Sequence, residues 1–242
     1  MIVAIRAQYS TQWDWKESLE ALSPIKDIEL AFFKPDDFMG VKIGEVIAPI
    51  QELGISVPTI HMAHAPQTEW WLFIQVLVKT LVLAKAVDCH SIVLHPSHGP
   101  VDGFDSLVEH QVLPLLGNCN LLWETFAGKR RILTAWKQLA GFCEKHEKNY
   151  ICYDVCHMHR STEGAIEDID EYGHLVKAYH FSNWKGDRQH LPIDEGEIDF
   201  SEIVSRLLKA GFGGSIALEY LPEHHHLLVR DALEINRLVY KH

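Results

Sequence analysis

Short apolar runs alternate along the whole chain with longer segments that have helical periodicity. Each run is apolar at nearly every position and rich in β-branched or aromatic residues, which is typical of a strand covered on both faces. Eight runs of this kind occur, at IVAIRA (2–7), IELAFF (28–33), VPTIHM (57–62), SIVLHP (91–96), NLLWET (120–125), YICYDV (150–155), VKAYHF (176–181) and SIALEY (215–220). The pattern therefore predicts eight strand–helix units.

Eight such units in a chain of 242 residues predict a single (β/α)8 barrel over residues 1–242. No stretch rich in Pro, Gly or Ser divides the chain, so we expect one domain. A doubly wound open sheet is the alternative. The barrel is favoured by where the polar residues fall.

Histidine and acidic residues stand at the carboxyl ends of most of the predicted strands. In a barrel these ends form one face, where the active sites of this fold lie, so residues far apart in the sequence converge on one pocket. Along the chain they are Glu29 within the second run, His61 and His64 at the third, His95 at the fourth, Glu124 at the fifth, Asp154 and His157 at the sixth, His180 at the seventh and Glu219 at the eighth.

A metal site explains this series better than isolated polar caps do. One strand-end histidine or carboxylate is more often a hydrogen-bonded cap of the core, but six successive strands with such ends would bury several unpaired charges at high cost. A divalent cation supplies the missing countercharge, and mixed nitrogen and oxygen ligands suit Zn, Mn, Fe or Co better than Ca or Mg. One ion would be held by Glu124, Asp154, His180 and Glu219, which leaves His64, His95, His157 and His190 for one or two more.

At these residues the sequence resembles the superfamily that unites endonuclease IV with the xylose isomerase-like sugar isomerases and epimerases. The matching stretches are HAP (64–66), VLHP (93–96), LLWETFAG (121–128), YDVCH (153–157), HFSNWK (180–185), DRQHLPIDEGEIDF (187–200) and ALEY (217–220). They follow the family's order over about two thirds of the chain, and D-x-C-H and H-L-P-x-x-E-G-E-I-D are the most specific. The resemblance implies a xylose isomerase-like TIM barrel.

The resemblance also implies roles for single residues. In endonuclease IV the positions that match Glu124, Asp154, His180 and Glu219 hold metal, and the position of Glu124 bridges two ions. The positions of His64 and His95 complete a second ion, and those of His157 and His190 help to hold a third. The family places an aspartate two residues before the histidine matched to His190, where this chain has Arg188, with Asp187 one residue further off. This departure weakens the expectation of a third ion.

Two chemistries share these ligands. A multinuclear zinc site would generate hydroxide and clamp the oxygens of a phosphodiester, as in an abasic-site endonuclease. A single Mn- or Co-like ion would instead bind the oxygens of a sugar, while Glu124 and Glu219 move a proton at the carbon next to the carbonyl. Such isomerases keep a histidine three residues after the aspartate, as His157 follows Asp154. A third hypothesis is a barrel that binds metal or ligand without catalysis.

The loops that would contact DNA favour the sugar. Endonuclease IV carries an arginine in the loop after its second strand and a tyrosine directly after HAP, and both invade the duplex. At the matching positions this chain has Asp37 and Gln67, and its formal net charge is −11, which is unfavourable for phosphate binding. We therefore predict a sugar or sugar-phosphate isomerase or epimerase that uses one to three divalent ions, zinc or manganese, with DNA as the less favoured substrate.

Other residues near the strand ends are candidates for substrate contacts. Lys34, Lys185 and Arg188 would hold a substrate phosphate, although a solvated surface charge is the alternative for each. Trp184 would form a wall of a sugar pocket, since aromatic faces pack against C–H surfaces.

Location and assembly follow from two segments. The first residues, MIVAIRAQYSTQWDW, have no basic region before a long apolar one, so we expect a cytoplasmic protein. The stretch EWWLFIQVLVKTLVLAKAV (69–87) has the length of a membrane span, but Gln75, Lys79 and Lys85 interrupt it. We expect a buried helix or a subunit interface there, with no membrane partner and a possible homodimer.

Overall fold

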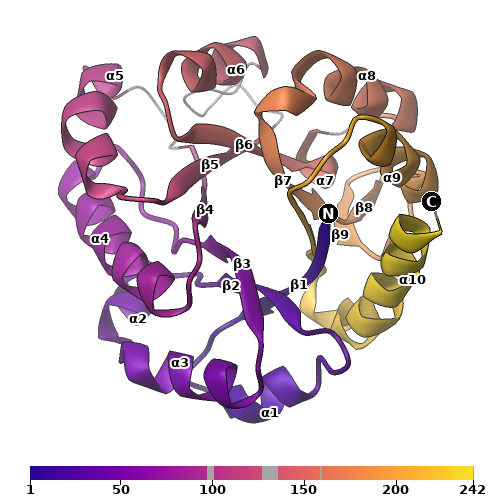
Figure 1. Cartoon of the computed structure of the whole chain (residues 1–242), viewed down its shortest axis with the longest axis horizontal. Helices are drawn as coiled ribbons and strands as arrows, with labels where there is room; N and C mark the ends of the chain where they lie inside the picture. Colours follow the sequence, from indigo (N-terminus) through magenta and orange to yellow (C-terminus); the bar gives the residue numbers. More distant parts are fainter. Residues whose placement is uncertain (97–100, 127–135, 159, 242) are drawn as a thin grey trace.

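Eight parallel strands close into a barrel in the order β1-β10-β7-β6-β5-β4-β3-β2 (Figure 1). The computed structural model describes residues 1–96, 101–126, 136–158 and 160–241. The strands are β1 (Ile2–Gln8), β2 (Asp27–Ala31), β3 (Ser56–His61), β4 (Ser91–Leu94), β5 (Asn120–Glu124), β6 (Asn149–Asp154), β7 (Val176–Phe181) and β10 (Ser215–Leu218). Each lies within about a residue of a predicted run or inside it, and the closed order confirms the barrel over the open sheet.

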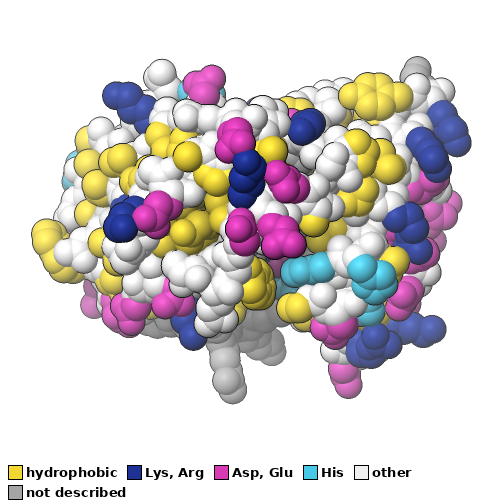
Figure 2. All heavy atoms as spheres, turned by 90° about the horizontal axis from the view of Figure 1, so that it is seen from below, with side chains coloured by type: hydrophobic (Ala, Val, Ile, Leu, Met, Phe, Trp, Pro, Cys, Tyr) yellow, Lys and Arg dark blue, Asp and Glu magenta, His cyan; other side chains and the backbone are white. Residues whose placement is uncertain are grey.

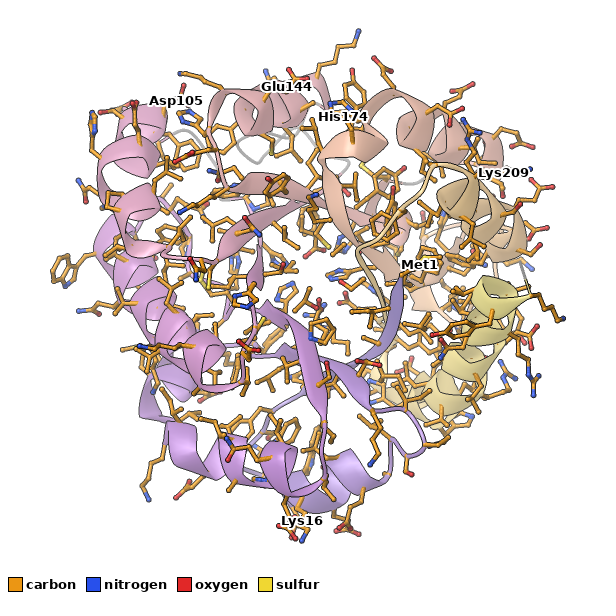
Figure 3. The ribbon with its side chains drawn as sticks, in the orientation of Figure 1. Met1, Lys16, Asp105, Glu144, His174 and Lys209 are labelled. Atoms are coloured by element: carbon orange, nitrogen blue, oxygen red, sulfur yellow. The ribbon has the colours of Figure 1, made fainter. Side chains whose placement is uncertain are left out.

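Helices form a ring around this barrel (Figure 1). They are α1 (Trp15–Glu20), α2 (Pro35–Gly40), α3 (Ile43–Glu52), α4 (Trp70–Ala86), α5 (Phe104–Leu107), α6 (Trp136–Lys145), α7 (Val155–Met158), α8 (Thr162–Tyr172), α9 (Phe200–Lys209) and α10 (Leu228–Tyr240), with the short turns η1 (Val108–Val112), η2 (Leu113–Leu115), η3 (Gly173–Leu175) and η4 (Pro222–Leu227). Figure 3 shows the labelled charged residues Lys16, Asp105, Glu144 and Lys209 on the outer surface of this ring. The barrel strands are therefore covered on their outer side and read as continuously apolar.

Side-chain acceptors begin several of these helices. Asp14 accepts a hydrogen bond from the backbone N–H of Glu17 at 3.0 Å, and Ser161 accepts one from Gly164 at 3.2 Å. Asp199, the last acid of the D-E-G-E-I-D stretch, accepts from Ser201 at 2.8 Å and caps α9. Because the first N–H groups of a helix have no internal partner, these side chains define where each helix starts.

The alternation of side chains along each strand divides the interior into two zones. Outward residues such as Leu121, Trp123, Tyr153 and Tyr179 pack in the main core beneath the helices. The inward residues Val93, Leu122, Cys152 and Ala178 form a small separate cluster inside the barrel. Since successive residues of a strand point to opposite faces, the residues two positions further along also point inward, towards the carboxyl ends of the strands.

Helix α4 packs one side on the barrel and leaves the other side open. Phe73, Leu77 and Leu83 are buried, whereas Trp71 is 74% exposed and Val82 is 54% exposed. Across the part of the chain that the structure describes, no helix is long and apolar enough to cross a bilayer. The exposed apolar side of α4 is compatible with a subunit interface, and the homodimer stays a prediction.

The backbone before β10 passes so close to β7 that a methyl group added at Gly214 should destabilise the fold. A Cβ on Gly214 would lie 2.1 Å from the carbonyl oxygen of Lys177, which is backbone and has no room to move, whereas a Cβ on Gly213 would meet nothing within 4 Å. We expect Gly214→Ala to lower the free energy of unfolding by about 1–3 kcal/mol through overpacking. Urea denaturation measures this, with Gly213→Ala as the control expected to change by less than about 0.5 kcal/mol. Equal effects of the two variants would contradict the close approach.

Candidate metal centre

The inward positions that follow the small apolar cluster carry the candidate ligands. Val93, Leu122, Cys152 and Ala178 are each followed two residues later by His95, Glu124, Asp154 and His180. Asp154 is paired with His180 in the register of β6 and β7, and Ala217, two residues before Glu219, is paired with His180 in that of β10 and β7. Barrel closure thus brings residues from the ends of five strands into one layer.

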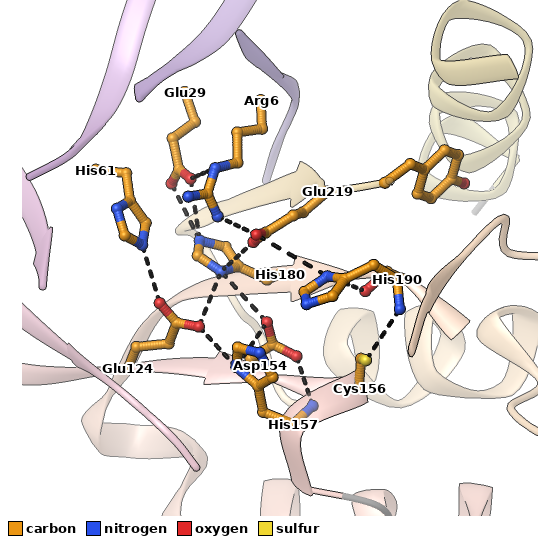
Figure 4. A network of polar contacts seen from close by, with 12 residues as sticks. Arg6, Glu29, His61, Glu124, Asp154, Cys156, His157, His180, His190 and Glu219 are labelled. Carbon is orange, nitrogen blue, oxygen red and sulfur yellow. Dashed lines mark hydrogen bonds and ion pairs between the residues drawn. The ribbon is translucent and has the colours of Figure 1, made fainter. Parts of the chain in front are cut away.

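Glu124, Asp154, His180 and Glu219 form one cluster around the imidazole of His180 (Figure 4). Nδ1 of His180 lies 3.1 Å from Glu219 Oε2, 3.6 Å from Asp154 Oδ2 and 3.8 Å from Glu124 Oε1. One ligand atom from each of the four residues falls within 4.8 Å of all the others. The first three residues are fully buried, and the side chain of Glu219 is 17% exposed. The cluster is therefore shielded, with an opening on the side of Glu219.

The atoms that face one another in this cluster have unused binding capacity. No hydrogen bond of acceptable geometry from any described residue reaches Glu124 Oε1, Asp154 Oδ2, His180 Nδ1 or Glu219 Oε2, although all four are buried. Buried polar atoms without partners are rare in native proteins and call for an ion or a water. Three carboxylate oxygens and one imidazole nitrogen are a ligand set that zinc or manganese accepts. The residues present therefore fit a divalent cation.

The second oxygen of each acid is already occupied by the protein. Asp154 Oδ1 accepts a hydrogen bond from the backbone N–H of His157 at 2.8 Å and so caps α7, which leaves Oδ2 for the cluster. Glu219 Oε1 forms an ion pair with the guanidinium of Arg6, which leaves Oε2. Each carboxylate is thus fixed through one oxygen and presents the other, an arrangement that orients a metal ligand in advance.

A second cluster shares Glu124. Glu124 Oε2 lies 3.0 Å from His61 Nε2 and 2.9 Å from His95 Nε2, and these three residues form a group able to hold a metal ion. The ring of His64, the expected ligand at this strand, has its centroid 5.4 Å from that of His95 and belongs to neither group. The ligand role of His64 stays a prediction, and the geometry brings His61 to this position instead.

The expected third ion has fewer ligands in place. His157 Nδ1 points into the first cluster, 2.8 Å from Glu124 Oε1 and 3.3 Å from Asp154 Oδ2. His190 lies on the hairpin of β8 (Asn183–Lys185) and β9 (Arg188–Leu191), with a positive φ of 54° and its ring centroid 5.1 Å from that of His157. Arg188 and Asp187 are exposed on this hairpin. No third cluster of candidate ligands forms among the residues described.

Charge around the cluster moves the pKa values of its members in opposite directions. Burial alone would raise the pKa of Glu124, but the surrounding histidines, His95 first among them, hold it well below its usual range. Burial likewise opposes ionisation of Glu219, and the Arg6 guanidinium outweighs it and lowers that pKa. Burial would lower the pKa of His157, but Asp154 and Glu124 raise it to about 9. Glu124 and Glu219 are therefore ionised, and His157 and His180 are protonated, when no metal is bound.

The residues expected to contact substrate lie around this face. Lys34, Asp37 and Trp13 line a cleft of about 260 Å³ between the loops that follow β1 and β2. Lys185 and Arg188 are exposed on the β8–β9 hairpin, and Trp184 is half-buried there. At least four hollows are larger than this cleft, with volumes of about 460–580 Å³. Two of them, of about 500 and 580 Å³, lie beside α4 and at the amino ends of β7 and β10. Neither contains a candidate ligand, so size alone does not locate the site.

Two residues of the network were not among the expected site residues. Arg6 and Glu29 are paired in the register of β1 and β2, and both side chains point towards His180 (Figure 4). Glu29 Oε1 forms an ion pair with Arg6 Nε at 4.0 Å. The sequence signal that could have revealed this pair is one basic and one acidic residue inside two successive apolar runs.

The last two residues of the LLWETFAG stretch, 127 and 128, lie outside the described residues.

The chain belongs to the xylose isomerase-like TIM barrel family, whose family model matches residues 28–237. An uncharacterised protein of Methanocaldococcus jannaschii is 23% identical over 174 residues, 67% of this chain and 60% of that protein. A probable endonuclease 4 of Staphylococcus carnosus is 29% identical over 167 residues, 63% of this chain and 55% of that protein. The chain thus spans little more than half the length of these relatives.

Solved structures of similar fold include sugar epimerases. An L-ribulose 3-epimerase superposes with a TM-score of 0.77 at 16% identity and covers 99% of this chain and 95% of its own. The IolI protein with a bound zinc atom superposes with a TM-score of 0.71 at 13% identity, covering 100% and 99%. These likenesses support the barrel fold.

Metal binding at this centre is expected to release protons. Because His157 and His180 have raised pKa values in the metal-free protein and a ligating imidazole must be neutral, an incoming cation displaces their protons. Affinity should therefore rise with pH from 6 towards 9, and titration calorimetry with Zn²⁺ in two buffers of different ionisation enthalpy should give about one proton or more released per ion. Binding without proton release would contradict this protonation state.

Proposed function

We propose that the protein is a divalent-metal-dependent isomerase or epimerase of a small sugar or sugar phosphate. The observation that carries this is the cluster of Glu124, Asp154, His180 and Glu219, whose unpartnered buried atoms converge at the carboxyl face of the barrel. A bound divalent ion would supply Lewis-acid polarisation of a sugar carbonyl, which acidifies the neighbouring C–H. Zinc or manganese suits the ligand set.

Glu124 and Glu219 are the groups that we assign to proton transfer. They come from β5 and from the end of β10, and both remain ionised because of His95 and Arg6 respectively. An ionised carboxylate can remove a proton from the carbon next to a carbonyl, and the second one can return it. Nδ1 of His157 lies 2.8 Å from Glu124 Oε1 and forms an ion pair with that carboxylate. A protonated His157 can therefore pass a proton to Glu124.

Local features of the loops support a sugar over DNA. Gln67, at the position of the duplex-invading tyrosine of endonuclease IV, is fully buried and donates a hydrogen bond to the backbone carbonyl of His95 at 3.1 Å. Asp36 and Asp37 are exposed at the start of α2, where a phosphate-binding surface would need a cation. Figure 2 shows one flank of the molecule, on which Lys and Arg side chains are interspersed with Asp and Glu. These positions of the chain thus lack the arginine and the tyrosine that the resemblance to endonuclease IV would lead us to expect.

A cleft at the same end of the barrel as the centre has room for a small ligand. It lies at the carboxyl ends of β1 and β2, on the same face as the cluster, and its volume of about 260 Å³ is just below the range of about 300–1,000 Å³ for small-molecule sites. Trp13, which is 58% exposed, and Phe33, which is 66% exposed, offer apolar faces there, and Lys34 offers a charge for a phosphate. The structural likeness to sugar epimerases points to the same substrate class.

Loss of either glutamate should abolish proton exchange while the barrel stays folded. The protein loaded with Mn²⁺ or Zn²⁺ is incubated in D₂O with a panel of ketopentoses, ketohexoses and their phosphates, and NMR follows deuterium uptake at the carbon next to the carbonyl. We expect Glu124→Gln and Glu219→Gln to slow uptake by about 10²–10⁴-fold, the usual contribution of general acid–base catalysis.

The control for this experiment is Glu52→Gln, which removes an exposed carboxylate on α3 that pairs only with Lys16 among the described residues. It should exchange at the wild-type rate, and circular dichroism should give the same spectrum for all variants. Wild-type exchange rates in Glu124→Gln and Glu219→Gln would refute the assigned roles. Absence of turnover on every sugar and on abasic DNA by metal-loaded protein would indicate a non-catalytic binding barrel.

The second candidate is a zinc phosphodiesterase of the endonuclease IV kind. The group of His61, His95 and Glu124 favours it, because this group can hold a second ion beside the first. The charge of the buried site limits the number of metal ions. Arg6 offsets one of the four acids Glu29, Glu124, Asp154 and Glu219, so one divalent ion leaves about one negative charge. Three ions would leave an excess of positive charge in a buried site.

Metal content therefore separates the two candidates. We expect elemental analysis of zinc-loaded protein to give one or two ions per chain and a duplex with a single abasic site to remain uncut. Three zinc ions per chain together with nicking of that duplex would replace the sugar isomerase by the endonuclease. A His61→Ala variant, which removes one ligand of the second group, should lose the second ion and keep the first.

A further inference from the structure

A buried glutamate stands behind the metal cluster and faces the side of His180 that the cluster does not use. Glu29 is fully buried in β2 and belongs to neither candidate metal group. Its two carboxylate oxygens lie 3.1 and 3.2 Å from His180 Nε2. The opposite ring nitrogen, Nδ1, faces Glu219, Asp154 and Glu124. Figure 4 shows the imidazole between Glu29 on one side and the cluster on the other.

Neighbouring strands fix Glu29 in this orientation. Thr59 of β3 donates a hydrogen bond from its hydroxyl to Glu29 Oε2 at 2.9 Å, and Arg6 Nε of β1 lies 4.0 Å from Oε1. The strand register pairs Glu29 with Arg6 on one side and with Thr59 on the other. These contacts come from rigid strands rather than loops, so the carboxylate has a defined position relative to the ring of His180.

The position of Glu29 selects the tautomer of His180. A neutral imidazole carries its proton on one nitrogen and a lone pair on the other, and the hydrogen bond made by one nitrogen decides which is free to bind a metal. A carboxylate is only an acceptor, so it requires the N–H at Nε2 and leaves the lone pair on Nδ1. Nδ1 is the atom that lies 3.1–3.8 Å from the three acids of the cluster.

We propose that Glu29 is a positioning residue, which holds His180 as the Nε2–H tautomer and aims Nδ1 at the divalent cation. The inference rests on the metal centre of the proposed function and goes beyond the ligand set itself. The guanidinium of Arg6 contacts both Glu29 and Glu219, and so connects the positioning residue to a candidate metal ligand. Glu29 thus acts through His180 and touches neither substrate nor ion.

Zinc affinity of Glu29→Gln tests this role. Competition titration with a chromophoric chelator should give a dissociation constant about 10–100-fold above that of wild type, the usual effect of removing an outer partner of a metal-ligating histidine. The matched control is Asp168→Asn, which neutralises another buried carboxylate, 6% exposed, that accepts from the Tyr153 hydroxyl at 2.7 Å on the outer side of the barrel. That variant should lose stability and bind zinc within about twofold of wild type.

NMR of the zinc-loaded wild type tests the tautomer without any substitution. With ¹⁵N-labelled histidine, His180 should show a proton on Nε2 that is shifted downfield and exchanges slowly, because it is buried and donates to a carboxylate. In Glu29→Gln the same proton should move upfield and exchange faster, even where excess zinc restores full occupancy. A purely structural salt bridge would change the stability and leave this signal in place.

The outcomes separate this inference from the proposed function. Zinc affinity of Glu29→Gln within about twofold of wild type, or a proton on Nδ1 of His180 in the loaded wild type, would overturn the positioning role while sugar turnover stands. Weakened zinc binding in Glu29→Gln together with no turnover on any sugar would support the positioning role and reject the isomerase. A wild type that takes up no zinc or manganese would overturn both.

Discussion

Repulsion among like charges inside a closed barrel is the constraint on which the rest of this structure depends. Glu29, Glu124 and Asp154 are fully buried, and Glu219 is nearly so. Ionised carboxylates at such close range in a low dielectric would destabilise the fold unless cations surround them. Arg6 and a group of imidazoles supply part of that charge, and a divalent ion would supply the remainder.

The protein meets this constraint by fixing one polar atom of each side chain and leaving the other atom for the cluster. Asp154 caps α7 with one oxygen and Glu219 pairs with Arg6 through one oxygen, while the other oxygen of each faces the cluster. In the same way, His180 contacts Glu29 through Nε2 and faces the cluster with Nδ1. The resulting site is built from strand ends, whose positions are fixed by the barrel, so its geometry needs little rearrangement when an ion binds.

Three departures from the endonuclease IV pattern lie in the loops around the centre. Gln67 is buried, Arg188 stands on an exposed hairpin at the position where endonuclease IV has an aspartate, and Asp37 is exposed at the start of α2. Under the proposed function, each would weaken a contact to DNA or to a third ion and would leave the central four residues in place. The same barrel can thus serve different chemistry through its loops.

The sequence by itself determined the barrel, the inward direction of the candidate ligands and the residue types that suit a metal. Continuous apolar runs with polar carboxyl ends carry that information, because alternation along a strand is local. Which inward residues meet was decided only by the tertiary structure. The choice of His61 over His64 beside Glu124, and the pairing of Arg6 and Glu29 behind His180, depend on strand register and on the inward reach of each side chain. The periodicity of one strand shows which face each residue points to, but it does not show which residue of another strand lies opposite. These partners could therefore be named only from the closed barrel.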